Sequence, residues 1–174
     1  MNRVFMAVKN WFCMGLLAFT GALGVVSLAA AQDNTSDPYL QIEQVTVELL
    51  DTIATHQVAY PANEEAYFDS LEQLLRDRID FAFIARNVMG NYHKQATPEQ
   101  RARFAATFRS GLVETYGRGL IGYENQEIVL VNAGEVAEGQ RRLTVKQEIR
   151  SADTVYPLEY SMARKKTGQW MVVN

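Results

Sequence analysis

The stretch ATPEQRARFAATFRSGLVETYGRGLIGY, residues 96–123, decides how this chain folds. Thr97 followed by Pro98 is a strong helix start, because the threonine hydroxyl caps the first turn and proline fits the first helical position. Gln100, three residues after Thr97, completes a capping box. Apolar side chains then recur at every fourth position, which predicts a long helix with a broad apolar face; they are Phe104, Phe108, Leu112, Tyr116 and Leu120.

The glycines and arginines of this predicted helix indicate what lies around it. Gly111, Gly117 and Gly119 each weaken the helix by about 1 kcal/mol relative to alanine. We interpret them as places where another element or a ligand lies close. Three arginines supply a polar side, which we interpret as a solvated face, with contact to a partner or a phosphate as the alternative; they are Arg101, Arg103 and Arg109.

Before this stretch, apolar residues also recur with the spacing of helices. Asp37 and Pro38 repeat the start signal, and the apolar spacing predicts a helix over 38–56 and a second over 64–78. A third helix is expected from Phe81, ending near a glycine at position 90.

The second half of the chain changes to strand periodicity. Four strands are predicted, over 127–132, 142–150, 154–164 and 169–173. Their short links indicate an antiparallel meander with one apolar face. Pro157 fits only an edge or a bulge, because proline lacks the N–H that a central strand must donate. Helices followed by strands predict an α+β fold with helices covering one face of the sheet.

The first 31 residues differ from the rest. Arg3 and Lys9 give a basic start, an apolar run follows over 11–28, and Ala29–Ala31 offers a cleavage site. This pattern predicts a secretory signal peptide over 1–31 and a single domain over 32–174. The alternative is a retained membrane anchor, because no charge interrupts residues 11–31.

Charge and cysteine content exclude several classes. Beyond residue 31 the chain carries 15 Lys and Arg against 20 Asp and Glu, a net charge of −5, and no cysteine. An acidic domain is a poor candidate for binding nucleic acid or an anionic membrane. An exported chain without cysteine has neither disulfides nor thiol chemistry, so its stability comes from its core.

The residues themselves select no catalytic or metal site. His56 and His93 read as surface or capping residues, and no zinc, phosphate-loop or nucleophile motif is present. Large apolar side chains dominate the predicted inward faces. They either fill the interior completely or enclose a cavity for an apolar ligand, and composition does not decide between the two.

One family resemblance narrows these options. The segment FAFIARNVMGNYHKQATPEQRARFAATFRSGLVETYG, residues 81–117, resembles the periplasmic phospholipid-binding proteins of the Mla lipid-asymmetry pathway, the MlaC-like or toluene-tolerance auxiliary family. The resemblance implies helices packed on a curved antiparallel sheet, a cone like that of nuclear transport factors, enclosing an apolar cavity for acyl chains. It implies no catalysis, no metal and no cofactor besides phospholipid cargo.

The same resemblance implies a place in the cell. A periplasmic monomer would shuttle phospholipid between an outer-membrane lipoprotein–porin complex and an inner-membrane ABC transporter complex with an MCE-domain subunit. This traffic maintains outer-membrane lipid asymmetry. The family continues beyond the last predicted strand, whereas this chain stops at Asn174, so we expect either a domain truncated at its C-terminus or a short variant of the family.

From the face assignments and this analogy we predict eleven lipid-binding positions: Val45, Leu49, Ile84, Val88, Phe104, Phe108, Leu112, Val145, Leu158, Tyr160 and Trp170. Two other classes of function stay open. One is a small enzyme on the same cone, an isomerase or dehydratase, which would need an acid–base pair converging inside the cavity. The other is a non-enzymatic interaction module with a filled core.

Overall fold

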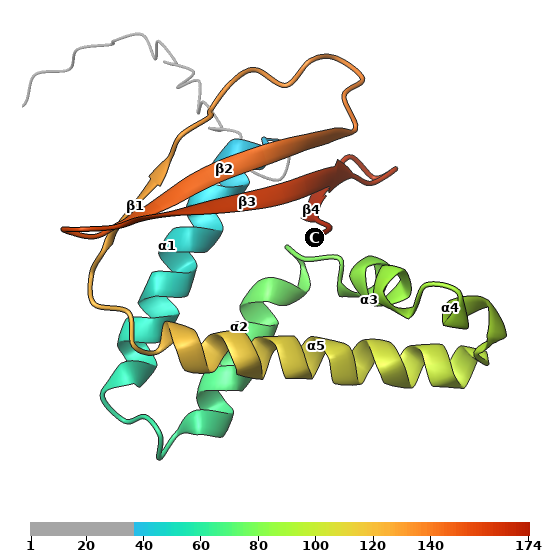
Figure 1. The fold of residues 1–174 in the computed structure, drawn as a ribbon, viewed down its shortest axis with the longest axis horizontal. Helices are drawn as coiled ribbons and strands as arrows, with labels where there is room; N and C mark the ends of the chain where they lie inside the picture. Colours follow the sequence, from blue (N-terminus) through green and yellow to red (C-terminus); the bar gives the residue numbers. More distant parts are fainter. Residues whose placement is uncertain (1–36) are drawn as a thin grey trace, which may run out of the picture. The chain divides into compact units, whose positions relative to one another are not determined.

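The computed structural model describes residues 37–174, and the predicted signal peptide and its membrane-anchor alternative lie outside the described residues. Five helices precede four strands (Figure 1). The helices are α1 (Pro38–Gln57), α2 (Glu64–Arg76), α3 (Phe81–Met89), α4 (Tyr92–Gln95) and α5 (Pro98–Leu120). The strands are β1 (Glu127–Leu130), β2 (Arg142–Arg150), β3 (Val155–Arg164) and β4 (Trp170–Val172). The α+β prediction is confirmed, and α4 is a short helix that the sequence analysis did not anticipate.

The helix starts follow the predicted caps. The Thr97 Oγ1 accepts from the Gln100 backbone N–H at 3.2 Å, and the Gln100 side chain accepts from the Thr97 N–H at 2.8 Å. Asp37 caps α1 without a returning side-chain bond, accepting from the Tyr39 N–H at 2.8 Å. At the end of α3, Gly90 adopts φ = 53°, a left-handed conformation that glycine tolerates without strain. Local capping chemistry therefore sets these boundaries.

Helix α5 packs against α2 through one of its three glycines. A Cβ on Gly117 would lie 2.8 Å from the Leu71 Cδ1 and 3.0 Å from the Phe68 Cε1. The Tyr67 hydroxyl donates to the Gly117 carbonyl at 3.1 Å, so the two backbones are held closely together. At Gly111 and Gly119 no atom lies within 4 Å of such a Cβ. The expected close neighbour is therefore confirmed at Gly117, and the expectation of a neighbouring protein element is wrong at the other two.

The four strands form one antiparallel sheet in the order β1-β2-β3-β4, as the meander prediction required. Pro157 lies opposite Glu148 of β2, while β4 pairs only with the Met162–Arg164 end of β3. The Arg164 N–H donates to the Arg141 carbonyl, and the alternation of an antiparallel ladder then turns the nitrogen of Pro157 away from β2. Pro157 thus sits on an open edge, as expected.

The interior consists of two apolar clusters. The sheet cluster is built by Ile42, Val145, Met162, Trp170 and Val172. The helix cluster is built by Ile53, Tyr67, Leu71, Phe81 and Val113. Helix α1 supplies Ile42 to the first cluster and Ile53 to the second, and Ile79 packs against both. The helices and the sheet therefore bury separate cores joined by α1 and by the segment between α2 and α3.

Candidate functional site: the apolar interior and its polar joints

The eleven predicted lining residues occupy three kinds of position. Val145 and Trp170 are 0% exposed within the sheet cluster, and Val45 and Tyr160 pack against it. Leu49 and Leu112 pack against the helix cluster. The remaining five, which belong to neither cluster, are Ile84, Val88, Phe104, Phe108 and Leu158. The structure therefore gathers part of the predicted set into two groups, and contact with lipid stays a prediction for all eleven.

The positions outside the clusters hold apolar surface that protein packing does not cover. The rings of Phe104 and Phe108 stack on each other with centroids 5.9 Å apart, and both side chains stay half-buried. Ile84 and Leu158 are also half-buried, whereas Val88 is 59% exposed. Large apolar side chains left in this state are available to a ligand or a partner.

A polar trio that the sequence analysis missed joins α1 to the sheet. Gln147 is only 3% exposed, and its Nε2 donates to the Thr46 Oγ1 at 3.1 Å. The Tyr160 hydroxyl donates to the Gln147 Oε1 at 3.1 Å. Burial raises the pKa of Tyr160, so this phenol stays a neutral donor. The available signal was position 147 itself, where a glutamine occupies the inward-facing phase of β2.

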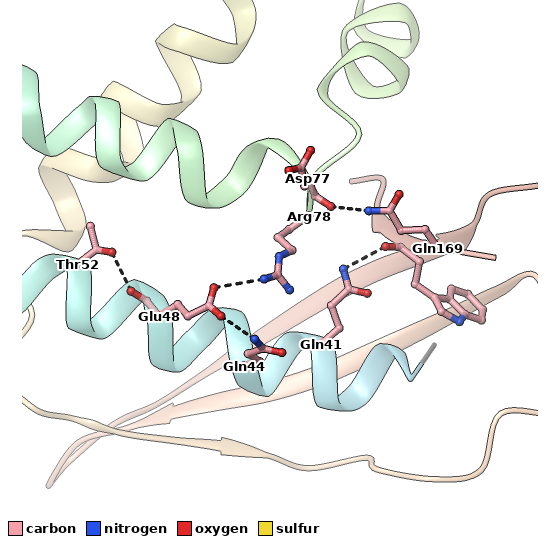
Figure 2. Close-up of polar contacts among 8 residues, drawn as sticks. Gln41, Gln44, Glu48, Thr52, Asp77, Arg78 and Gln169 are labelled. Atoms are coloured by element: carbon pink, nitrogen blue, oxygen red, sulfur yellow. Dashed lines mark hydrogen bonds and ion pairs between the residues drawn. The ribbon is translucent and has the colours of Figure 1, made fainter. Parts of the chain in front are cut away.

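A second polar joint connects α1 with the segment that follows α2 (Figure 2). The Arg78 guanidinium contacts the Glu48 carboxylate at 3.3 Å, and the Gln44 side chain donates to the same carboxylate at 2.7 Å. Both partners of the ion pair are partly exposed, so the pair itself contributes about 1 kcal/mol or less to stability. It links α1 directly to the segment that follows α2.

The same segment is bonded to β4. The Gln41 side chain donates to the Trp170 carbonyl at 3.0 Å, and the Gln169 side chain donates to the Asp77 carbonyl at 2.9 Å (Figure 2). The Val172 N–H donates to the Arg78 carbonyl, and the Val172 carbonyl accepts from the Asp80 N–H, both at 2.9 Å. These bonds hold the last strand beside the start of α3. The two apolar clusters therefore meet at a fixed, hydrogen-bonded junction.

The histidines lie in different surroundings. His56, in the last turn of α1, contacts the Asn63 side chain at 3.0 Å and the Ser70 hydroxyl at 3.2 Å, so its partners are neutral. The pKa of His93 is lowered by burial and by the charges of Arg101 and Arg86. Over residues 37–174 no group of three or more His, Cys, Asp or Glu side chains is placed to hold a metal ion. None of the helices in that range is long and apolar enough to cross a membrane.

Comparison with known proteins gives a consistent family. The sequence model described as MlaC protein matches residues 43–174. The toluene tolerance protein ttg2D of Pseudomonas putida is 30% identical over 161 residues, covering 92% of this chain and 72% of that protein. The intermembrane phospholipid transport system binding protein MlaC of Haemophilus influenzae is 26% identical over 168 residues, covering 95% and 76%.

A solved structure supports the fold. The phospholipid-binding protein from Ralstonia solanacearum, determined in complex with a phospholipid, superimposes with a TM-score of 0.63. The two chains are 23% identical, and the match covers 78% of this chain and 75% of that one. At this identity the likeness establishes a shared arrangement of helices and strands.

Proposed function

The chain belongs to the MlaC family, and on that premise we propose that it is a periplasmic phospholipid carrier of the Mla pathway. The family assignment rests on 132 matched residues, from 43 to 174. The names of its relatives refer to toluene tolerance and to intermembrane phospholipid transport, and both fit a protein that moves lipid between membranes.

The observation that carries the proposal is the apolar surface that lies outside the two packed clusters of the interior. A carrier must replace most of what a bilayer gives to acyl chains, and each buried CH₂ is worth about 0.8 kcal/mol. Two chains of ordinary length therefore represent on the order of 20 kcal/mol. Large apolar side chains that are half-buried yet outside both packed clusters offer surface for this purpose; they are Ile84, Phe104, Phe108 and Leu158.

The buried Gln147–Tyr160 pair is compatible with this role because its polar groups are satisfied internally, whereas the buried Gln41 Oε1 and Trp170 Nε1 have no hydrogen-bond partner among residues 37–174. Gln147 and Tyr160 bond to each other, so neither presents an unpaired group to an acyl chain. An unpaired buried polar group would cost about 1–3 kcal/mol. We propose the acyl chains lie along the apolar positions, with the head group near solvent.

In the proposed function, the protein exchanges lipid with a complex in each of the two membranes. Lipid would pass between an outer-membrane lipoprotein–porin complex and an inner-membrane ABC transporter complex with an MCE-domain subunit, and this protein would cross the periplasm between them as a monomer. The bound phospholipid is cargo, and the role requires no catalysed reaction.

The test is transfer of a labelled phospholipid between two populations of vesicles by the protein purified from the periplasm. Phe108→Asn places a polar group on the uncovered apolar surface, and we expect it to slow transfer about 5- to 100-fold. Tyr116→Asn is the matched control on the same helix, because Tyr116 is 66% exposed and is not one of the eleven predicted lipid-binding positions. It should leave the rate within about twofold.

Two results would contradict the proposal. Wild-type protein that neither retains nor transfers phospholipid would remove the function altogether. Equal losses in Phe108→Asn and Tyr116→Asn, with both variants folded by circular dichroism, would show that Phe108 has no specific role in binding lipid.

A further inference from the structure

A small cavity between α3 and α5 is bounded by cationic side chains. It has a volume of about 230 Å³. Its walls are short side chains from both helices, together with one methionine, and they are Ala82, Ala85, Met89, Ala102 and Ala105. The polar residues that line it are Arg86 from α3, His93 from α4 and Arg101 from α5. Three nitrogen-bearing side chains thus surround a hollow that alanines keep open.

The two arginines lack the carboxylate partners that other arginines of the chain have. Arg78 and Arg109 contact glutamates at 3.3 and 3.2 Å. Neither Arg86 nor Arg101 forms a salt bridge with any carboxylate in the described range. The Arg101 Nε is closed off from solvent and has no hydrogen-bond partner among residues 37–174. A shielded, unpartnered N–H of a cation is a costly arrangement unless an acceptor binds there.

Arg86 also contacts an aromatic ring of its own helix. Its guanidinium lies 5.2 Å from the centroid of the Phe83 ring, in cation–π geometry. A guanidinium stacked on a ring keeps its N–H edge available for a planar acceptor. This contact favours one orientation of the guanidinium beside the cavity.

The electrostatic surroundings also favour an anion. Residues 81–108 contain four Arg and Lys and one acidic residue, although the chain as a whole is acidic. That acid, Glu99, is not among the cavity's lining residues, and its pKa is lowered by its own backbone N–H and by the Thr97 side chain at the helix cap. Arg101 lies in the first turn of α5, at the positive end of the helix dipole, where a cation is unfavourable by itself. Burial, and then the charges of Arg101 and Arg86, lower the pKa of His93.

We propose that Arg86, His93 and Arg101 form a binding site for a phosphate group. Arginine pairs bind phosphate oxygens through charge-assisted hydrogen bonds, and the histidine adds a further donor. The group is either the phosphodiester of a lipid head group or free phosphate, which share the same oxyanion chemistry. The site requires no acyl chain, so it goes beyond the proposed carrier function. Phosphate binding at this site can be tested independently of lipid transfer.

The experiment follows the two histidine rings by NMR in protein purified from the periplasm. It uses two probes without acyl chains, inorganic phosphate and glycerophosphoethanolamine, in titrations at constant ionic strength. His93 should shift saturably, and His56, the other histidine of the chain, should not move. Arg86→Gln and Arg101→Gln should weaken binding about tenfold to hundredfold. Arg103→Gln removes the same charge from an exposed neighbour that does not line the cavity, so it should change binding less than about threefold.

The two probes distinguish the sources of the phosphate. Tighter binding of glycerophosphoethanolamine assigns the site to lipid head groups, and tighter binding of inorganic phosphate assigns it to the free ion. The proposal is overturned if neither probe shifts the His93 ring saturably in wild-type protein, or if Arg103→Gln weakens binding as much as Arg101→Gln. The wild-type titration needs no variant, so a misfolded mutant leaves the test intact.

Discussion

Alanine substitution at Gly117 tests whether the contact between α2 and α5 is as close as the structure places it. Alanine would raise helix propensity by about 1 kcal/mol. Its methyl group would also lie 2.8 Å from the Leu71 Cδ1 and 3.0 Å from the Phe68 ring. Leu71 is only 1% exposed and has little room to move, so we assign an overpacking cost of about 1–3 kcal/mol. The net expectation is destabilisation of about 0–2 kcal/mol.

Gly111→Ala supplies the reference for this measurement. A Cβ at Gly111 meets no atom within 4 Å, so that variant should gain about 0.5–1 kcal/mol from propensity alone. Both substitutions restrict the unfolded chain equally, so the unfolded-state contribution cancels in their difference. Urea unfolding followed by circular dichroism should place Gly117→Ala about 1–3 kcal/mol below Gly111→Ala. Equal stabilities of the two variants would refute the close packing of α5 on α2.

Two further substitutions probe the polar groups. Gln147→Leu leaves the Tyr160 hydroxyl without its acceptor, and we expect the free energy of unfolding to fall by about 1–3 kcal/mol. Adding Tyr160→Phe should restore part of that loss. No restoration in the double variant would refute the pairing. Hydrogen bonds from Arg118 and then Tyr60 lower the pKa of Glu64 in the folded protein. The ionised carboxylate therefore contributes stability above the ordinary glutamate pKa. That stability is lost as the pH falls through the lower pKa of the folded state. Glu64→Gln should therefore flatten the acid limb of a stability–pH profile, and an unchanged limb would contradict this linkage.

The parts of the fold that follow from neighbouring residues were predictable. Thr97, Pro98 and Gln100 lie within one helical turn, so the start of α5 needs no tertiary information. Pro157 carried its own constraint, because a residue without an N–H must face an unpaired edge. The four residues of α4 are too few for a periodic pattern, and that helix was missed.

The division of the interior was not predictable from periodicity. The apolar face of α1 continues along the helix, and only tertiary structure assigns Ile42 to the sheet and Ile53 to the helices. The bridge between Ile79 and Val172 joins residues more than ninety positions apart. For the same reason, the eleven lipid-binding positions were predicted only from the apolar faces of helices and strands. Those faces did not distinguish the buried Trp170 from the exposed Val88.

Native mass spectrometry of the protein purified from the periplasm tests the carrier function most directly. Denaturing analysis of the released material identifies what was bound. The proposed function predicts a mass that exceeds the polypeptide by one or two phospholipid molecules, whose acyl chains can then be counted. A mass equal to the polypeptide alone, with no phospholipid in the released fraction, would contradict it.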